Sequence, residues 1–133
     1  MKYMMLMQFS AAQTDFPGID SWSAEELQAH IAFMRDTNEK LAASGEFVDA
    51  QGLAMPDQAR IVRADGGRAP VVSDGPFPET KEFLAGWWIV DCETPERAIE
   101  LAATVSAAPG PGGRPLNMPI EVRPVMSVPS PEV

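Results

Sequence analysis

His30 is the only histidine in the chain, and histidine is the side chain that takes up and releases protons most readily near neutral pH. As a general base or acid it would need a carboxylate to orient its ring, and Asp74 is the best candidate for that role. A lone histidine at the border of a helix is also commonly a structural residue whose ring is satisfied by hydrogen bonds. The sequence therefore leaves two interpretations of His30: a catalytic pair with Asp74, or a structural side chain.

Asp74 opens a segment that carries many charges for a turn. Residues 71–91 read VVSDGPFPETKEFLAGWWIVD, so Asp74, Glu79, Lys81 and Glu82 stand between two apolar runs. An aspartate here can fix the turn by accepting hydrogen bonds from backbone amides. An exposed pair between Glu79 and Lys81 would contribute only about 0–1 kcal/mol, which is too little to explain so many charges by stability alone.

The last strand of the sequence offers partners for these charges. Ile120 and Val122 alternate with Glu121 and Arg123, so the apolar pair and the charged pair point to opposite faces. In one interpretation, the charged pair completes a salt-bridge network with the charged turn. In the other, Arg123 or Lys81, with Glu79 beside it, is left to bind the carboxylate of a small acidic ligand.

Two adjacent tryptophans indicate where such a ligand would be held. Trp87 and Trp88 fall on opposite faces of the strand expected at residues 83–91. One of them belongs to the core on the helix side, and the other faces a cavity or a subunit interface. An aromatic wall suits a small planar or lactone-like ligand, and we take Trp88 as the candidate for that contact.

The composition excludes several functional classes. The 133-residue chain has a net charge of −9 and no basic patch, which argues against binding to nucleic acid. Cys92 is the only cysteine, so an internal disulfide is impossible and a reducing cytoplasm is the expected compartment. One histidine and one cysteine cannot build a Cys/His zinc site, and no motif predicts another metal or a cofactor. No apolar run is long enough to span a membrane.

The N-terminal half of the sequence predicts a strand, a helix and a short strand. Residues 2–9 could be a signal peptide, but they alternate regularly and lack a small-residue cleavage site, which favours a strand. Ser23 and Glu26 form a capping box that begins a helix, and Gly45 ends it. The apolar residues of this helix form one stripe, which we expect to face the sheet: Leu27, Ile31, Met34 and Leu41. His30 lies about 60° from the centre of that stripe, which predicts a half-buried position.

The C-terminal half continues with a hairpin, a strand, a helix and a strand. Asp65-Gly66-Gly67 predicts a hairpin turn between two apolar segments, and residues 83–91 predict a strand. Thr94-Pro95 begins a second helix, which runs to about residue 105 and points Ile99, Ala102 and Val105 inward. Residues 107–119 are expected to be a flexible loop, at most a mobile lid, and residues 120–125 a last strand. We assign residues 1–126 to one domain and 127–133 to a flexible tail.

This order of elements predicts the fold class. Without the inserted hairpin it is the split βαβ, or ferredoxin-like, α+β plan, in which two helices cover one face of an antiparallel sheet. Residues 2–9 and 83–91 are apolar on both faces, so the open face of the sheet also needs a cover. A second copy of the chain is the simplest cover, and we expect a homodimer packed sheet to sheet.

The charged turn and the last strand together resemble a known family. Asp74-Gly75-Pro76-Phe77, followed by Glu79, Lys81 and Glu82 and by the segment 121–124, is similar to the motifs of DGPF proteins, part of the YCII-related group. The resemblance runs from residue 2 to about residue 125. It implies a ferredoxin-like subunit that forms a dimeric α+β barrel. Related proteins include an enzyme that acts on chlorinated muconolactones, and other DGPF domains are linked to extracytoplasmic-function sigma factors.

The resemblance also bears on the candidate residues. YCII-type proteins are thought to use a histidine–aspartate pair, and His30 stands in the position of their histidine. Their aspartate lies just after the second helix, where this chain has Val105-Ser106-Ala107-Ala108 and no carboxylate. Asp74 therefore remains the candidate to orient His30.

Two functions follow as hypotheses. The first is a cofactor-independent enzyme, isomerase-like or lyase-like, in which His30 moves a proton on an acidic organic metabolite whose carboxylate is neutralised by Arg123 or Lys81. The second is a non-catalytic dimeric module that binds a ligand or a protein, with a sigma factor as the partner suggested by the resemblance.

Overall fold

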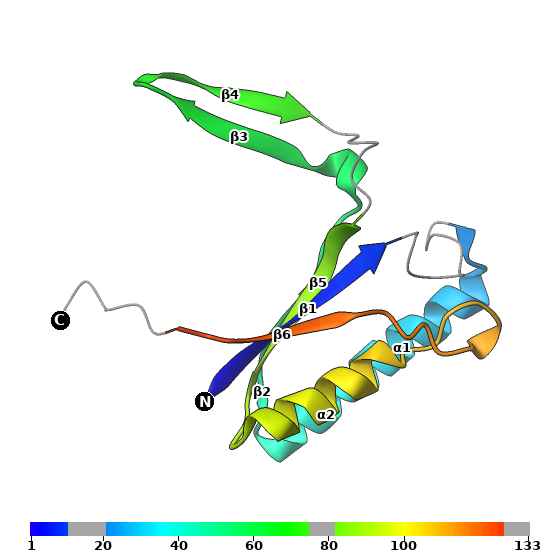
Figure 1. The fold of residues 1–133 in the computed structure, drawn as a ribbon. Coiled ribbons are helices and arrows are strands. Elements are labelled where there is room, and N and C mark those ends of the chain that lie inside the picture. Colours follow the sequence, from blue (N-terminus) through cyan, green and yellow to red (C-terminus); the bar gives the residue numbers. More distant parts are fainter. Residues whose placement is uncertain (11–20, 75–81, 127–133) are drawn as a thin grey trace.

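A computed structural model of the chain describes residues 1–10, 21–74 and 82–126, without the side chains of Ser10 and Asp74. The elements along these residues are shown in Figure 1. In chain order they are β1 (Lys2–Ser10), α1 (Ala24–Ser44), β2 (Phe47–Gly52), the 3-10 turn η2 (Pro56–Gln58), β3 (Arg60–Asp65), β4 (Arg68–Asp74), β5 (Glu82–Asp91), α2 (Pro95–Ser106), the 3-10 turn η3 (Pro111–Gly113) and β6 (Ile120–Pro124).

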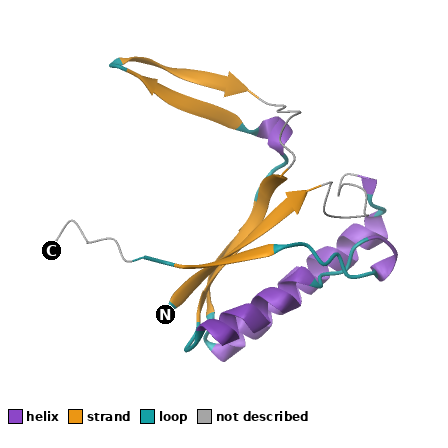
Figure 2. Ribbon diagram, in the orientation of Figure 1, coloured by secondary structure: helices purple, strands orange, loops and turns teal. Residues whose placement is uncertain are grey.

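The main sheet has the strand order β2-β5-β1-β6, and all its neighbours are antiparallel. Both helices lie on one face of it (Figure 2). This confirms the α+β ferredoxin-like prediction. Strands β3 and β4 form a separate two-stranded sheet, which is the predicted inserted hairpin. No helix among the described residues is long and apolar enough to cross a membrane.

Local sequence signals account for the ends of the helices. The Ser23 hydroxyl accepts from the Glu26 amide at 3.1 Å, and the Glu26 carboxylate accepts from the Ser23 amide at 2.9 Å, which is the predicted capping box. Gly45 ends α1 with a left-handed φ of 81°. The Thr94 hydroxyl accepts from the Arg97 amide and begins α2 one residue before Pro95.

The predicted inward faces of both helices are partly wrong. On α1, Leu27 is 36% exposed and Ile31 is 46% exposed, whereas the side chains buried against the sheet are His30, Thr37 and Leu41. His30 is therefore on the buried face, 8% exposed, and not half-buried at its border. On α2, Ile99 is 60% exposed. The buried residues of α2 are Ala98, Leu101, Ala102 and Val105.

The core lies between the helices and one face of the sheet. Its centre on β1 is Met5, which is fully buried between Tyr3 and Met7. A bulge in β5 places Gly86 opposite Met7 and Leu84 opposite Gln8, with Ala85 between them. Because of this extra residue, Phe83 and Ala85 face the helix side before the bulge and Trp88 faces it afterwards.

The opposite face of the sheet has no helix over it among the described residues. Met4 lies opposite Ile89, and Leu6 lies opposite Trp87; all four are half-buried. We call this set the open face. The charged pair of β6 belongs to it, because Glu121 lies opposite Leu6 and Arg123 opposite Met4.

Candidate functional site

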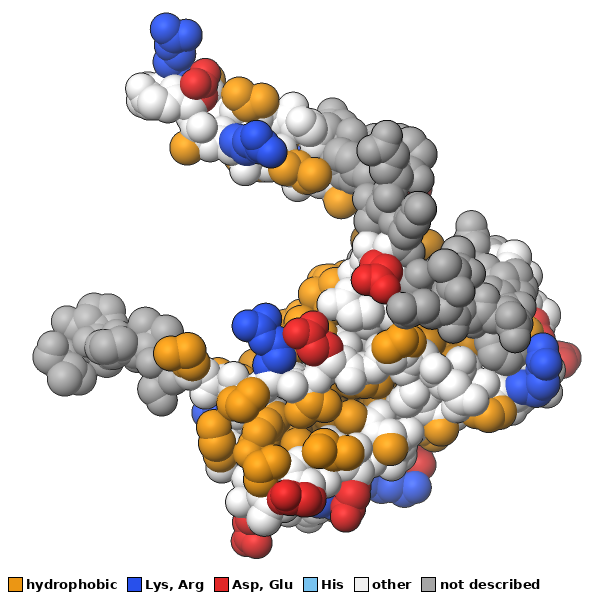
Figure 3. All heavy atoms as spheres, viewed as in Figure 1, with side chains coloured by type: hydrophobic (Ala, Val, Ile, Leu, Met, Phe, Trp, Pro, Cys, Tyr) orange, Lys and Arg blue, Asp and Glu red, His pale blue; other side chains and the backbone are white. Residues whose placement is uncertain are grey.

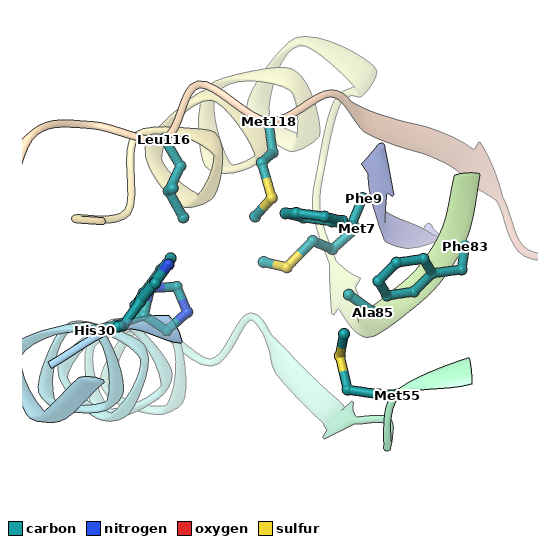
Figure 4. A pocket seen from close by; sticks show the side chains of 9 residues that line it. Met7, Phe9, His30, Met55, Phe83, Ala85, Leu116 and Met118 are labelled. Atoms are coloured by element: carbon teal, nitrogen blue, oxygen red, sulfur yellow. The ribbon is translucent and has the colours of Figure 1, made fainter. Parts of the chain in front are cut away.

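A small apolar cavity lies between the sheet, α1 and the loop that precedes β6. Its volume is about 60 Å³, and Figure 4 shows the side chains around it. Several segments contribute to its wall: Met7 and Phe9 from β1, Trp22 just before α1, His30 from α1, Met55 after β2, Phe83 and Ala85 from β5, and Leu116 and Met118 before β6. Apart from the two rings that carry nitrogen, the described wall is hydrocarbon and thioether.

His30 is the titratable side chain of this wall, and its ring is held from two sides. Nδ1 lies 3.0 Å from the carbonyl oxygen of Pro109, and the ring meets the edge of Trp22 in a T-shaped contact with centroids 5.3 Å apart. A carbonyl oxygen can only accept, so Nδ1 carries a proton and donates it. In the neutral ring Nε2 then holds the lone pair.

Nε2 is the second nitrogen of a ring that lines the cavity. Nε2 has no hydrogen-bond partner among the described residues, and every fully buried side-chain polar atom of those residues has one. Nε2 is therefore accessible from the cavity rather than sealed in the core. In Figure 4 the His30 ring points from α1 towards the side chains of β1 and β5. A proton acceptor in a largely apolar cavity is the main chemical feature of this site.

The Pro109 carbonyl is placed by a folded loop, not by the flexible one expected from the sequence. Residues 109 and 115 form an isolated bridge, and the Leu116 amide donates to the Ala108 carbonyl at 2.9 Å. Gly110 is buried against Leu116, and a Cβ added at Gly110 would force the Leu116 side chain to shift. The loop therefore has a defined shape that presents one carbonyl to the histidine ring.

Glu26 fastens this loop to the start of α1. Its second carboxylate oxygen accepts a hydrogen bond of 2.6 Å from the amide of Gly112, while the first accepts from Ser23. These hydrogen bonds, with that of the Ser23 amide the strongest influence, lower the pKa of Glu26. Glu26, which belongs to the capping box of α1, thus also holds the loop whose Pro109 carbonyl orients His30. His30 lies four residues after Glu26 on the same helix.

A wider cleft of about 370 Å³ adjoins the cavity. It shares Met7, His30 and Phe83 with the cavity and continues along α1 to Asn38 and Trp88. The Trp88 Nε1 donates to the Asn38 Oδ1 at 2.9 Å. A cleft of this size is within the usual range for small-molecule sites. The structure therefore brings together two of the candidate site residues, His30 and Trp88.

The other candidate residues are not part of this arrangement as far as the structure describes them. Arg123 is on the open face, the side of the sheet opposite His30, and its Nε lies 3.9 Å from a carboxylate oxygen of Glu121. Asp74 ends β4 opposite Arg60, but its side chain is outside the described part of the chain. Glu79 and Lys81 also lie outside the described residues. The orienting group that the structure gives His30 is the backbone carbonyl of Pro109.

The described residues provide neither a metal site nor a reactive thiol. Among the described residues, no three His, Cys, Asp or Glu side chains gather in a way that could hold a metal ion. Cys92 is buried, and burial raises the pKa of its thiol, which disfavours the reactive thiolate. The chemistry of the described site thus rests on His30.

Sequence reasoning missed three features of the site. Pro109 contributes only a backbone atom, which no residue type could reveal. Asn38 follows His30 by eight residues, a spacing that places both on one helix face, and this signal was available. Phe83 faces the cavity together with Phe9, with ring centroids 5.3 Å apart, because of the bulge in β5.

Comparison with known proteins places this chain in a family. The model of the YCII-related domain matches residues 1–110, a range that contains both His30 and Pro109. An uncharacterised protein of Rhizobium meliloti (strain 1021) is 30% identical over 105 residues, which cover 79% of this chain and 80% of the relative. The chain belongs to the YCII-related family.

Proposed function

We propose that the chain is a cofactor-independent enzyme that binds a small carbonyl compound in the cavity beside His30 and moves a proton on it. The observation that carries this proposal is the hydrogen bond of His30: Nδ1 donates to the Pro109 carbonyl, which leaves the lone pair on Nε2 of a ring that lines the cavity. Without that hydrogen bond the His30 ring could rotate, and the lone pair that acts as the base would have no defined orientation.

The reaction that suits these parts is an isomerisation or elimination next to a carbonyl. Nε2 takes a proton from the carbon beside the carbonyl, and the electron pair of the broken C–H bond moves into an enolate. In an isomerisation the imidazolium returns the proton to a different carbon. In an elimination the electron pair expels a leaving group instead. Apolar walls exclude water from the enolate, which favours return of the proton by His30.

The walls also constrain the ligand. No described residue that lines the 60 Å³ cavity carries a charge other than the one His30 can acquire. A free carboxylate inside it would lack a partner, and burying an unpaired charge is costly. The reacting carbonyl is therefore expected in the cavity, and an acidic group of the ligand in the wider cleft towards Asn38 and Trp88. A neutral lactone carries no acidic group, so it can bind in the cavity without placing any part in the wider cleft.

The proposed working form is a homodimer through the open face. The half-buried residues Met4, Leu6, Trp87 and Ile89 support it, because apolar side chains of a sheet are usually covered. The cavity is on the other side of the sheet, among the helices, so a dimer of this kind leaves it accessible.

The test uses α-angelica lactone, a small neutral lactone with an acidic C–H beside its carbonyl. We expect the protein to accelerate deuterium uptake at that carbon in D₂O, followed by proton NMR. His30→Gln keeps a polar side chain but removes the base, and it should lower the rate by about 10²–10⁴-fold. Thr37→Val, on the same buried face of α1 but outside the cavity wall, is the matched control and should keep the wild-type rate. Equal rates in wild type and His30→Gln would refute the catalytic role.

One observation favours a second candidate, a non-catalytic module that binds a ligand or a protein. The group that orients His30 is a neutral carbonyl, and it stabilises an imidazolium less than a carboxylate does. In that case the lactone would bind, as seen by saturation-transfer NMR, without any deuterium uptake. Binding would then be similar in wild type and in His30→Gln.

A further inference from the structure

The β3–β4 hairpin carries large apolar side chains of the kind that are usually buried, yet it is exposed. Its turn follows the sequence signal, with Gly66 and Gly67 at φ 51° and 87°. Every residue of β3 is exposed, and so is every described side chain of β4. The exposed fraction is about half for each of its large apolar side chains: Ile61 50%, Val62 59%, Val71 51% and Val72 51%.

Both faces of this hairpin carry large apolar side chains. Val62 lies directly opposite Val72, and these two side chains share one face. Ile61 and Val71 share the other face, because they lie opposite Ser73 and Arg63. A hairpin that is polar on one side could lie at a surface, whereas one with β-branched pairs on both sides gains stability only when something packs on it. An isolated two-stranded hairpin is marginal in water.

The position of the hairpin indicates what packs on it. Figure 1 shows it projecting from one end of the main sheet on the side away from the two helices, which is the side of the open face. Figure 3 shows apolar side chains along the hairpin and on the body below it, with a hollow between them. A strand of six residues spans roughly 20 Å, so the hairpin is long enough to contact a molecule bound to the open face.

Charge favours a second copy of the chain as that object. Arg60, Arg63 and Arg68 against Asp65 and Asp74 leave the hairpin at +1, so the rest of the −9 chain carries −10. Arg63 and Arg68 form no ion pair with a described residue. A basic, apolar hairpin is complementary to the acidic body of its own chain, and a two-fold dimer repeats that contact twice.

We propose that the β3–β4 hairpin is an intersubunit arm. In the homodimer each arm lies on the body of the second copy, where it covers its β-branched pairs and brings Arg63 and Arg68 near acidic groups. This inference rests on the proposed dimer and adds to it a second contact, outside the sheet-to-sheet surface. The dimer is then expected to dissociate more readily when only the arm is altered.

The first experiment measures the dimer dissociation constant by sedimentation velocity. Val62→Glu/Val72→Glu places two charges in the proposed contact and should raise the constant on the order of 100-fold. Ile31→Glu/Ile99→Glu is the matched control: it adds the same charge at two exposed apolar residues of the helices and should change the constant less than about threefold. Because all four residues are exposed, both variants are expected to fold, which circular dichroism checks.

The second experiment maps where the arm lies. A photo-crosslinking amino acid is placed at Val72, and ¹⁴N-labelled and ¹⁵N-labelled chains are mixed before irradiation. Crosslinks that join an arm of one label to a body of the other support the proposal. An unchanged dissociation constant in Val62→Glu/Val72→Glu, with crosslinks only within chains, overturns the arm and leaves the dimer standing. A wild-type chain that is monomeric at tens of micromolar overturns both.

Discussion

The helix side of the main sheet and the β3–β4 hairpin contain similar side chains in very different surroundings. On the helix side Met5, Val90 and Val105 are fully buried, and polar groups such as the His30 ring are hydrogen-bonded within the chain. On the hairpin, Val62 and Val72 are about half exposed or more. Residue type does not distinguish the two regions. What distinguishes them is burial: among the described residues, the helix-side side chains are packed within the chain and those of the hairpin are exposed.

This difference separates two kinds of stability. The side chains around Met5 stabilise the single chain, because they lose contact with water when it folds. We expect those of the hairpin to contribute little in a single chain and to be covered in the proposed dimer, so their stabilisation should depend on protein concentration. Substitutions in the two regions should therefore differ both in size and in their dependence on concentration.

The largest effect is expected in the core. Met5→Ala removes a fully buried side chain at the centre of β1 and should lower the free energy of unfolding by about 2–5 kcal/mol. Val72→Ala removes a half-exposed side chain and should cost less than about 0.5 kcal/mol in a dilute, monomeric sample. Urea denaturation measures both. A large cost for Val72→Ala in the monomer would show that the hairpin packs on its own body.

A smaller effect is expected at the loop that orients His30. A side chain at Gly110 would collide with Leu116, so Gly110→Ala should cost about 1–3 kcal/mol and shift the Pro109 carbonyl. The ¹⁵N chemical shifts of His30 report its tautomer: the wild type should be protonated at Nδ1, and the variant should lose this preference. Gly52→Ala is the control, because nothing lies within 4 Å of the added methyl group. A fixed Nδ1–H tautomer in Gly110→Ala would mean that the loop does not hold the ring.

Local signals in the sequence were sufficient for the elements and their order. The capping box at Ser23 and Glu26, the stop at Gly45 and the Gly66-Gly67 turn each depend on contacts within a few residues. Alternation predicted that Trp87 and Trp88 face opposite ways, and that Glu121 and Arg123 share the face opposite to Ile120 and Val122. Such contacts can be read from a short window, because no distant segment changes them.

The site was less predictable, because its geometry depends on distant segments. Apolar spacing on α1 favoured Leu27 and Ile31 as inward residues, yet His30 is buried in their place because the carbonyl of Pro109, 79 residues away, satisfies its ring. Hydrophobicity alone cannot predict that a polar side chain will find such a partner. The bulge in β5, which turns Phe83 towards the cavity, lies next to Gly86, and a glycine within a strand indicates that a bulge is possible without fixing which side chains it turns inward.

The smallest effect concerns an ion pair at the opposite end of the helix side from His30. Glu46, just before β2, accepts two hydrogen bonds of 2.9 Å from Arg97 of α2, and these lower the pKa of Glu46 to about 2 from the ordinary 4.5. Because the folded-state pKa is the lower one, the ionised carboxylate stabilises the fold above pH 4.5, and this contribution is lost as the pH falls towards 2. Arg97 is 44% exposed, so solvent screens the pair and Glu46→Gln should cost only about 1 kcal/mol at pH 7.

The pH dependence separates this ion pair from a general effect of charge. The difference in unfolding free energy between wild type and Glu46→Gln should stay constant from pH 7 to about pH 5 and then shrink as the pH falls towards 2. Glu100→Gln removes the other carboxylate partner of Arg97, which is 67% exposed, and should have a smaller effect at every pH. Equal effects of the two substitutions would mean that Arg97 contributes only net charge. A larger effect for Glu46, lost in acid, would mean that it joins β2 to α2 and so helps to hold the helix side together without a partner.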